Sequence, residues 1–492
     1  MNDNQLDISN YSEKIAAQED HILFEDAVTI GRMGKYRAAY IMIWLSCAES
    51  LKRRFREASK WDHHAGQIFS DIESKESSHM AVDRLVLDRA KEYGFISDLD
   101  YENLKYIYQM RCVYGHPYEE APLKENVVNA AAIVVNSVLS KSVKLRHGYG
   151  ESILKKLLEN SNFLDDQESA VEIFANQFIL RFDNQLYGWL LDKYWKKLEE
   201  ISDDESMAMF IRRGVWFSCA VINNVGASIF SYEEWHSKLS NFPKILMQVC
   251  AIENIFKNIG ESAQNMLVGI IIEESMRKAS VLSYLEELSM NNLLTERQED
   301  RLNKRVLSLS SDEIRGARLK LKTCYYNVIT KLKSYNWYIQ NPVVDLIMLN
   351  GEREIADLSV EQQVELGRNI LQTCDGGSKT ACEFLKNIVK NNSSWPFDFL
   401  RGIVLETFNN ERSQIRIKKN NFNDVICIIC NLSVEQRNRL LGEIVRSIDV
   451  GVLNDPWMNE QNFNKVINIL EGFEWAEALS GKLKDKYNAK FH

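Results

Sequence analysis

An arginine and a histidine in the stretch YQMRCVYGHPYEE are the residues of this chain best suited to chemistry. Arg111 carries a permanent positive charge, and His116 has an imidazole that titrates near neutral pH. Their R-x-x-x-x-H spacing is a weak signal by itself, because both residue types recur in a chain of 492 residues. The two are either a catalytic pair or unrelated polar residues that satisfy a loop, so their surroundings must be considered.

The segments around the pair favour a functional role. Leu104, Tyr108 and Arg111 follow each other at helical spacing, on a face that we expect to point inward. An arginine at the end of such a face needs a partner or a site. Glu49 lies in an apolar helix upstream, and a buried glutamate needs a cation, so we expect it to pair with Arg111. His116 follows in a loop between two helices, where functional residues commonly lie.

Four helices are expected to position these residues. Their predicted ranges are 36–59, 80–93, a segment starting at 98, and 124–143. The first of them is apolar nearly all round in its first half, which predicts deep burial. Gly94 suits the C′ position that ends the second. Four helices in residues 1–148 predict a helical bundle, which we take as the first domain.

This domain resembles the HEPN superfamily, whose members are four-helix bundles. The similarity lies in GKYRAAYIMIWLSCAESLKRRF followed by RCVYGH, two motifs in the order that the family shows. It covers about residues 20–145. Many members are metal-independent endoribonucleases that carry an R-x4–6-H motif. The resemblance therefore implies an RNA-cleaving domain that uses neither a metal ion nor another cofactor.

The resemblance also implies a role for each residue of the motif. His116 is the general base for the ribose 2′-hydroxyl, and Arg111 holds the phosphate oxygens. Glu49 is an auxiliary residue, while Tyr114 and Tyr118 either stack on an unpaired base or pack the loop. The implied products are a 2′,3′-cyclic phosphate and a 5′-hydroxyl, from tRNA or another cellular RNA. The family usually builds its site at a homodimer interface, and its ribonucleases often act as toxins or in defence against phage.

One position departs from the family pattern. A polar residue, typically asparagine or aspartate, often follows the motif arginine, whereas this chain has Cys112. Cysteine packs like a small hydrophobic residue, so a group that helps to position the pair is missing. The alternative is therefore a non-catalytic HEPN-like binding module on a helical protein-interaction scaffold.

The rest of the chain is also expected to be helical, which makes the whole protein all-α. Six prolines in 492 residues leave room for long helices, since proline blocks helix interiors. A chain of this length is expected to form two or three domains. We assign residues 149–290 to a helical domain and residues 291–492 to a helical domain that resembles a repeat.

Three segments support that repeat. LSVEQQVELGRNILQTCDGG and LSVEQRNRLLGEIVRSIDVG match well, and LTERQEDRLNKRVLSL is a more distant relative. Ser359, Ser433 and Thr295 each precede a glutamine by three residues, which predicts a capping box. Gly377 and Gly451 suit helix ends. Either three unrelated helices share a good cap, or the segments form a helical repeat whose surface binds a protein partner or a trigger that controls the bundle.

Composition narrows the class of protein further. The net charge of −9 argues against a protein that coats nucleic acid through bulk charge, although a local basic cleft is allowed. Nine scattered cysteines fit a reducing, cytoplasmic setting, and no apolar run is long enough to cross a membrane. Asp62, His63 and His64 are expected in a solvated loop. Cys427 and Cys430 lack the second pair that a zinc site needs.

Overall fold

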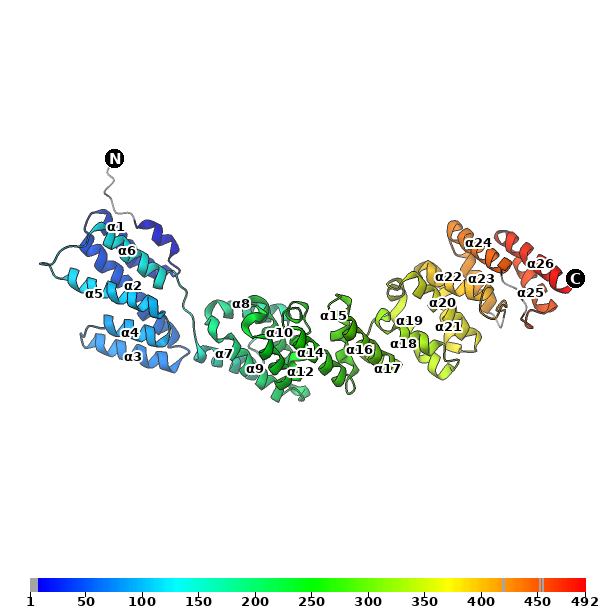
Figure 1. The fold of residues 1–492 in the computed structure, drawn as a ribbon, viewed down its shortest axis with the longest axis horizontal. Coiled ribbons are helices and arrows are strands. Elements are labelled where there is room, and N and C mark those ends of the chain that lie inside the picture. Colours follow the sequence, from blue (N-terminus) through cyan, green and yellow to red (C-terminus); the bar gives the residue numbers. More distant parts are fainter. Residues whose placement is uncertain (1–7, 418–420, 451–452, 454) are drawn as a thin grey trace, which may run out of the picture. The chain divides into compact units, whose positions relative to one another are not determined.

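The computed structural model describes residues 8–417, 421–450, 453 and 455–492. Within these ranges the regular elements are helices, and the one β-type contact is an isolated bridge between Leu145 and Phe182 (Figure 1). The all-α class predicted from the sequence is therefore confirmed. No helix in these ranges is long and apolar enough to cross a membrane.

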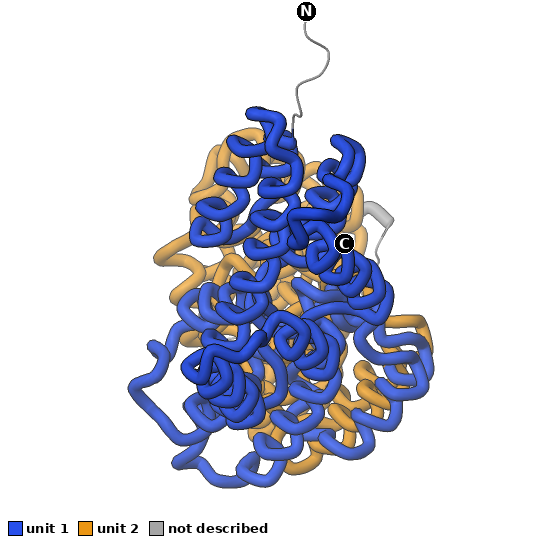
Figure 2. The backbone as a smooth tube through the Cα atoms, turned by 90° about the vertical axis from the view of Figure 1, so that its left-hand side faces the viewer, with its two compact units in different colours: residues 1–263 blue, residues 264–492 orange. Residues whose placement is uncertain are grey.

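The chain forms two compact units, residues 1–263 and residues 264–492 (Figure 2). The division falls in the first turn of α14 (Glu261–Glu274). We expected boundaries near residues 148 and 290, so the compact units number two where three domains were expected. Whether residues 149 and 291 begin parts that fold independently stays a prediction.

The first unit opens with helices packed around α2 (Tyr36–Ala58). The helices that contact it are α1 (Gln18–Arg32), α3 (His63–Ser77), α4 (Asp83–Tyr93), α5 (Asp98–Gly115) and α6 (Lys124–Val134), the last continued by a π-helical turn, η2 (Val135–Leu139). Large side chains of α2 are fully buried, among them Trp44 and Phe55. An apolar helix of this kind is stable because its neighbours cover it on several sides.

The four predicted helices are present, and two further helices join them. α1 and α3 were not predicted. The expectation of a solvated loop at Asp62, His63 and His64 was wrong, because Asp62 is the N-cap of α3: its carboxylate accepts hydrogen bonds from the backbone N–H groups of His64 and Ala65. The last predicted helix ends at residue 139 instead of 143.

The remainder of the first unit is a second group of helices with an aromatic core. They are α7 (His147–Glu159), α8 (Glu168–Arg181), α9 (Tyr187–Glu200), α10 (Ala208–Val225), α11 (Tyr232–Asn241), α12 (Pro243–Val249) and α13 (Glu253–Phe256). Trp195 and Trp235 are fully buried there, with their ring centroids 5.9 Å apart. Short 3-10 turns connect elements along the whole chain: η1 (Ser9–Lys14), η3 (Asn184–Leu186), η4 (Glu205–Met207), η5 (Ala227–Ile229), η6 (Ala279–Val281), η7 (Asn392–Ser394) and η8 (Glu474–Ala476).

The second unit continues in the same style. After α14 its helices are α15 (Leu282–Met290), α16 (Glu296–Leu307), α17 (Ser311–Ala317), α18 (Leu321–Leu332), α19 (Trp337–Ala356), α20 (Val360–Asp375), α21 (Lys379–Lys390), α22 (Phe397–Phe408), α23 (Asn421–Cys430), α24 (Val434–Val450), α25 (Glu460–Leu470) and α26 (Glu477–Phe491). The most extensive helix pair is α20 with α22. They cross so closely that a Cβ atom added at Gly402 would lie 2.2 Å from the carbonyl oxygen of Val364.

The three predicted capping boxes are confirmed. The backbone N–H groups of Thr295, Ser359 and Ser433 each donate to the side chain of the glutamine three residues later, at 2.9, 3.0 and 3.3 Å. Gly377 follows the end of α20 with a φ of 106°, a left-handed conformation that favours glycine. Gly451 lies outside the described residues.

Candidate functional site

The end of α5 brings the two motif residues to one edge of the bundle. We expected Arg111 at the end of a helical face and His116 in the loop between two helices. α5 continues past Arg111 to Gly115, and His116 is its C-cap residue. The His116 backbone N–H donates to the carbonyl of Val113 at 3.1 Å. Arg111 therefore lies on the helix just before its end, and His116 is the first residue beyond it.

His116 combines a fixed backbone with a free imidazole. Its side chain is exposed, and within the described residues its ring has no hydrogen-bond partner. The connection from α5 to α6 projects from the bundle (Figure 1). A histidine in this place is open to a substrate, so its position depends on what holds the loop.

Arg37, in the first turn of α2, holds that loop. Its guanidinium donates to the backbone carbonyls of Tyr114 at 3.1 Å and Glu119 at 2.6 Å, and also to the carbonyl of His116. Because Arg37 comes from the central helix of the bundle, it ties the loop to the core across 79 positions of sequence. We did not predict this residue. The sequence shows its position in the GKYRAAY motif, but nothing in the pattern shows which carbonyls it reaches.

The carboxylate beside Arg111 is Asp83. One guanidinium nitrogen of Arg111 lies 3.5 Å from the Asp83 carboxylate, which also accepts a hydrogen bond from the Trp44 indole at 2.9 Å. Asp83 lies in the first turn of α4, where the helix dipole favours a negative charge. Trp44 and α4 together thus fix the acid, and the acid orients the Arg111 side chain.

The predicted pairing of Glu49 with Arg111 was wrong. The Glu49 side chain is 53% exposed, and its ion pair is with Lys52 at 2.7 Å. The prediction treated α2 as buried on every side. Glu49 instead faces solvent, and Lys52 lies three residues later on the same face of the helix. Glu49 therefore has no contact that would assist catalysis within the described residues.

The two tyrosines of the motif have different surroundings. Tyr114 is buried, and its ring packs edge-on against Tyr40 with centroids 5.0 Å apart. It is a packing residue under the loop. Tyr118 is 99% exposed, so its ring is open to a base.

Cys112 occupies the position where the resembled family often has a polar residue. It is half-buried and hydrogen-bonded to Tyr108, whose ring packs against Trp44 at 5.2 Å. Burial raises the pKa of Tyr108, and the neighbouring Cys112 adds to that shift. Cys112 thus packs beside Tyr108 on the same helix and does not point a strong hydrogen-bonding group at the motif.

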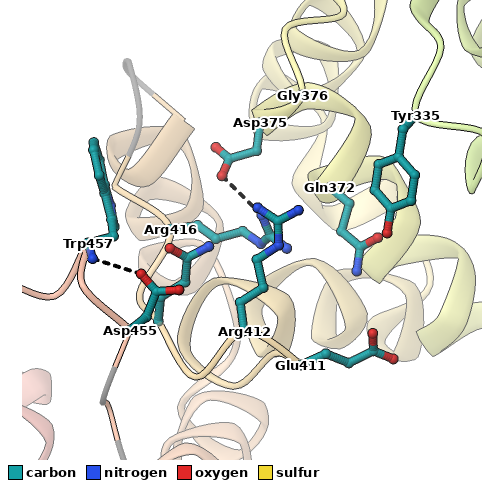
Figure 3. Close-up of a pocket in the computed structure, with 10 residues that line it drawn as sticks. Tyr335, Gln372, Asp375, Gly376, Glu411, Arg412, Arg416, Asp455 and Trp457 are labelled. Atoms are coloured by element: carbon teal, nitrogen blue, oxygen red, sulfur yellow. Dashed lines mark hydrogen bonds and ion pairs between the residues drawn. The ribbon is translucent and has the colours of Figure 1, made fainter.

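The second unit has a polar cavity of about 420 Å³ at the end of α20 (Figure 3). Arg416 lies between two acids there, 2.6 Å from Glu406 and 3.3 Å from Asp375. Tyr335 and Trp457 both line the cavity and lie on opposite sides of it in Figure 3. The lining carries both signs of charge, so it favours no single class of ligand.

The described residues contain no group of three or more histidine, cysteine or acidic side chains that could hold a metal ion. Cys427 is exposed and Cys430 is half-buried, and both lie on α23. The candidate site therefore consists of Arg111, His116 and the residues that hold them, Asp83 and Arg37.

Comparisons of the chain with protein-family models, curated proteins and solved structures found no match.

Proposed function

We propose that the bundle is a HEPN-like ribonuclease domain that cleaves RNA without a metal ion, in the cytoplasm. The observation that carries the proposal is the state of His116: its imidazole is free and exposed, while Arg37 fixes its backbone. A general base has to be accessible to its substrate and has to be held in place, so an exposed imidazole on a held backbone supports this role.

The proposed reaction uses the two motif residues. His116 takes the proton of the ribose 2′-hydroxyl, the 2′-oxygen attacks the adjacent phosphorus, and the bond from phosphorus to the 5′-oxygen breaks. The leaving 5′-oxygen takes up a proton from water. The products are a 2′,3′-cyclic phosphate and a 5′-hydroxyl. Arg111 stabilises the charge on the phosphate oxygens. Asp83 contacts one of its nitrogens at 3.5 Å, and since a guanidinium has five N–H donors, the others can bind the phosphate.

A homodimer is part of the proposal. Tyr106 and Val113 lie seven residues apart on one face of α5 and are 50% and 42% exposed. Tyr118 and Leu123, in the following loop, are 99% and 68% exposed. Exposed apolar side chains gathered near a candidate site mark a contact surface. A second copy of the chain packed on these side chains would bring the two His116 loops together.

Two observations favour a second candidate function. The ion pair of Arg111 with Asp83 and the packing of Cys112 would also suit an arginine that only stabilises the bundle. The domain would then be a non-catalytic binding module, and the second unit would be a protein-interaction scaffold. In that case replacing His116 would leave every RNA unchanged.

RNA cleavage in the presence of EDTA tests the proposal. Purified full-length protein would be incubated with total RNA and with tRNA, and the new ends mapped. We expect the wild type to leave cyclic phosphates, His116→Ala to lose cleavage by at least about 100-fold, and His236→Ala to match the wild type. His236 is a suitable control because it is an exposed histidine on α11 of the same unit. Equal cleavage by the wild type and His116→Ala would exclude the assigned base.

Cell growth tests the proposed role as a toxin or an antiphage effector. We infer that the second unit receives a trigger and holds the bundle inactive until the trigger binds. Because even a small active fraction increases with the amount of protein, overexpression of the wild type should arrest growth, while His116→Ala at the same protein level should not. If both proteins arrest growth equally, the toxicity is independent of His116 and this role falls.

A further inference from the structure

The first unit has a cavity of about 500 Å³. It lies at the C-terminal end of α2, whereas Arg37 is at the N-terminal end. Four cations and a single carboxylate contribute to its lining, together with one aromatic ring: Arg53, Lys60, Lys141, Arg181, Glu57 and Trp61. The rest of the wall is mainly small or apolar. This is a local basic site in a chain whose net charge is −9.

The walls of this cavity are fixed by interactions behind them. Arg53 is held by Asp20 at 2.7 Å and by Glu57 at 3.0 Å. Arg54, which is 2% exposed, donates to the carbonyls of Val138 and Lys141 and so holds the segment after η2. A preformed wall is what a binding site requires, since a ligand then does not have to order it.

The opposite wall is held by the backbone. The Leu145 N–H donates to the carbonyl of Arg181 at 2.6 Å, and the Asp183 N–H donates to the carbonyl of Leu145 at 2.9 Å. The Lys144 amine donates to the carbonyls of residues 179 and 180 at 3.3 and 3.1 Å. These contacts place the end of α8, and with it Arg181, beside the segment that carries Lys141.

Two of the four cations have no carboxylate partner among the described residues. Lys141 pairs with Asp100 at 2.9 Å, and Arg53 has its two acids, but Lys60 and Arg181 are exposed and form no ion pair within the described residues. Like charges that converge on one hollow repel each other unless an anion lies between them. Lys60 and Arg181 are therefore available to a negatively charged ligand.

We propose that this cavity binds the phosphate groups of an RNA strand. The cations come from three separate segments, the end of α2, residue 141 and the end of α8, so they suit several phosphates along a strand better than the single phosphate of a free nucleotide. Trp61 offers a half-buried aromatic wall for a base, with the Lys156 amine 5.0 Å from its ring centre. The choice of RNA rests on the proposed function, whereas the charge of the ligand does not.

The cavity is separate from the Arg111 and His116 site. Arg37 and Arg53 lie sixteen residues apart on α2, which is roughly 24 Å along the axis and about 160° around it. RNA held here would extend beyond the segment that is cut. Its contribution would then be to substrate affinity, and so to KM, and not to the chemical step.

Binding of a fluorescently labelled single-stranded RNA to the full-length chain tests this inference. His116→Ala serves as the background, so that the RNA stays intact. Adding Lys60→Glu and Arg181→Glu should weaken binding at least tenfold and reduce the slope of log affinity against log salt by roughly 1.4, for two phosphates. The control pair Lys196→Glu and Arg297→Glu makes the same change of charge at two exposed positions outside the cavity and should stay within twofold of the background.

Three results of the binding experiment would overturn the inference: no change in the cavity variant, an equal loss in the control pair, or AMP binding at this cavity as tightly as the strand, which would make it a free-nucleotide site. If the charge reversals unfold the protein, Lys60→Gln with Arg181→Gln replaces them, with at least threefold weaker binding expected. Failure of the proposed function is distinguishable, because a wild type that never cleaves RNA can still show the binding loss. Cleavage with an unchanged KM in the cavity variant would exclude the binding site and leave the proposed function intact.

Discussion

Arg37 is the residue on which the position of His116 depends most directly. It donates to three carbonyls of the motif loop from the start of α2, where Ala39 and Tyr40 are buried. The loop has few other backbone hydrogen bonds: those of residues 116 and 119 are local, at 3.1 and 3.3 Å. Arg37 is thus a positioning residue, which acts on catalysis through His116 without touching the substrate.

Replacing Arg37 with alanine should therefore reduce kcat strongly and change the free energy of unfolding only a little. A displacement of about 1 Å at a catalytic group can cost up to about 100-fold in rate, so we expect a kcat loss of that order with KM changed much less. Limited proteolysis should also cut the loop between residues 116 and 121 faster than in the wild type. Arg56→Ala, which removes an exposed arginine near the other end of α2, is the matched control. An Arg37→Ala protein with normal kcat and normal proteolysis would show that the loop positions itself.

Individual residues also show where prediction from sequence ends. The motif pair was identified from its spacing and from a resemblance, both of which are local in sequence. The acid beside Arg111 was not, because Asp83 is 28 positions away on a different helix and only the packing of α4 against α5 brings them together. Glu49 was chosen because its own helix is apolar, but the exposure of one position on a helix depends on which neighbours cover that face.

At the scale of helices, the crossing of α20 and α22 is the contact most sensitive to side-chain size. An added Cβ atom at Gly402 would lie 2.2 Å from the Val364 carbonyl oxygen, and one at Gly367 would lie 2.2 Å from the Phe399 carbonyl oxygen. Backbone atoms cannot move aside as a flexible side chain can. The two glycines therefore set the distance between these helices, and larger residues would force the pair apart.

Gly402→Ala should destabilise the second unit by roughly 2–3 kcal/mol, since overpacking of a tight contact costs about that much. Gly442→Ala on α24 is the matched control, because an added Cβ atom there meets nothing within 4 Å. Alanine is the better helix former, so the control should be neutral or stabilised by up to about 1 kcal/mol. Urea unfolding would measure both. A Gly402→Ala protein as stable as Gly442→Ala would contradict the close crossing.

The ion pair between α22 and α24 predicts a dependence on pH. Two nitrogens of Arg401 each donate to Glu443 at 2.8 Å, and this holds the pKa of the Glu443 carboxyl below its usual value near 4.5. A lowered pKa in the folded state adds stability above the unfolded pKa, and this stability is lost as the pH falls through the folded pKa.

Arg401→Met should therefore cost up to about 1 kcal/mol at pH 7, the upper range for a pair that is partly open to water. The difference from the wild type should shrink as the pH falls from 5 to 3. Urea unfolding at pH 7, 5 and 3 would measure it. A constant difference across this range would mean that Arg401 stabilises the helices by packing, not by its charge.

Helix prediction succeeded where the signal lies in the helix itself. Ser359 with Gln362, and Ser97 at the start of α5, are caps whose partners lie within three residues. α3 was not predicted because the polar residues Asp62, His63 and His64 suggested a loop. Ile68 and Ile72, which follow them, have helical spacing and are buried. The basic cavity could not be predicted at all, since its lining comes from residues as far apart as Ala16 and Arg181.

On the scale of the whole molecule, the chain divides its stability between two cores. Residues 1–263 and 264–492 each contain enough chain for a domain, and each buries its own set of large apolar side chains. Leu51 on α2 and Leu366 on α20 are both fully buried. This arrangement suits the proposed division of labour, in which one unit acts on RNA and the other responds to a partner.

Scanning calorimetry should therefore resolve two transitions that respond to different substitutions. Leu51→Ala and Leu366→Ala each leave a cavity in a buried position, at a cost of about 3 kcal/mol. For units of this size that cost lowers Tm by roughly 6–12 °C. Leu51→Ala should move one transition and leave the other in place, and Leu366→Ala should do the reverse. If either substitution moved both transitions by the same amount, the two units would unfold as one, and a trigger on the second could then act on the first through stability alone.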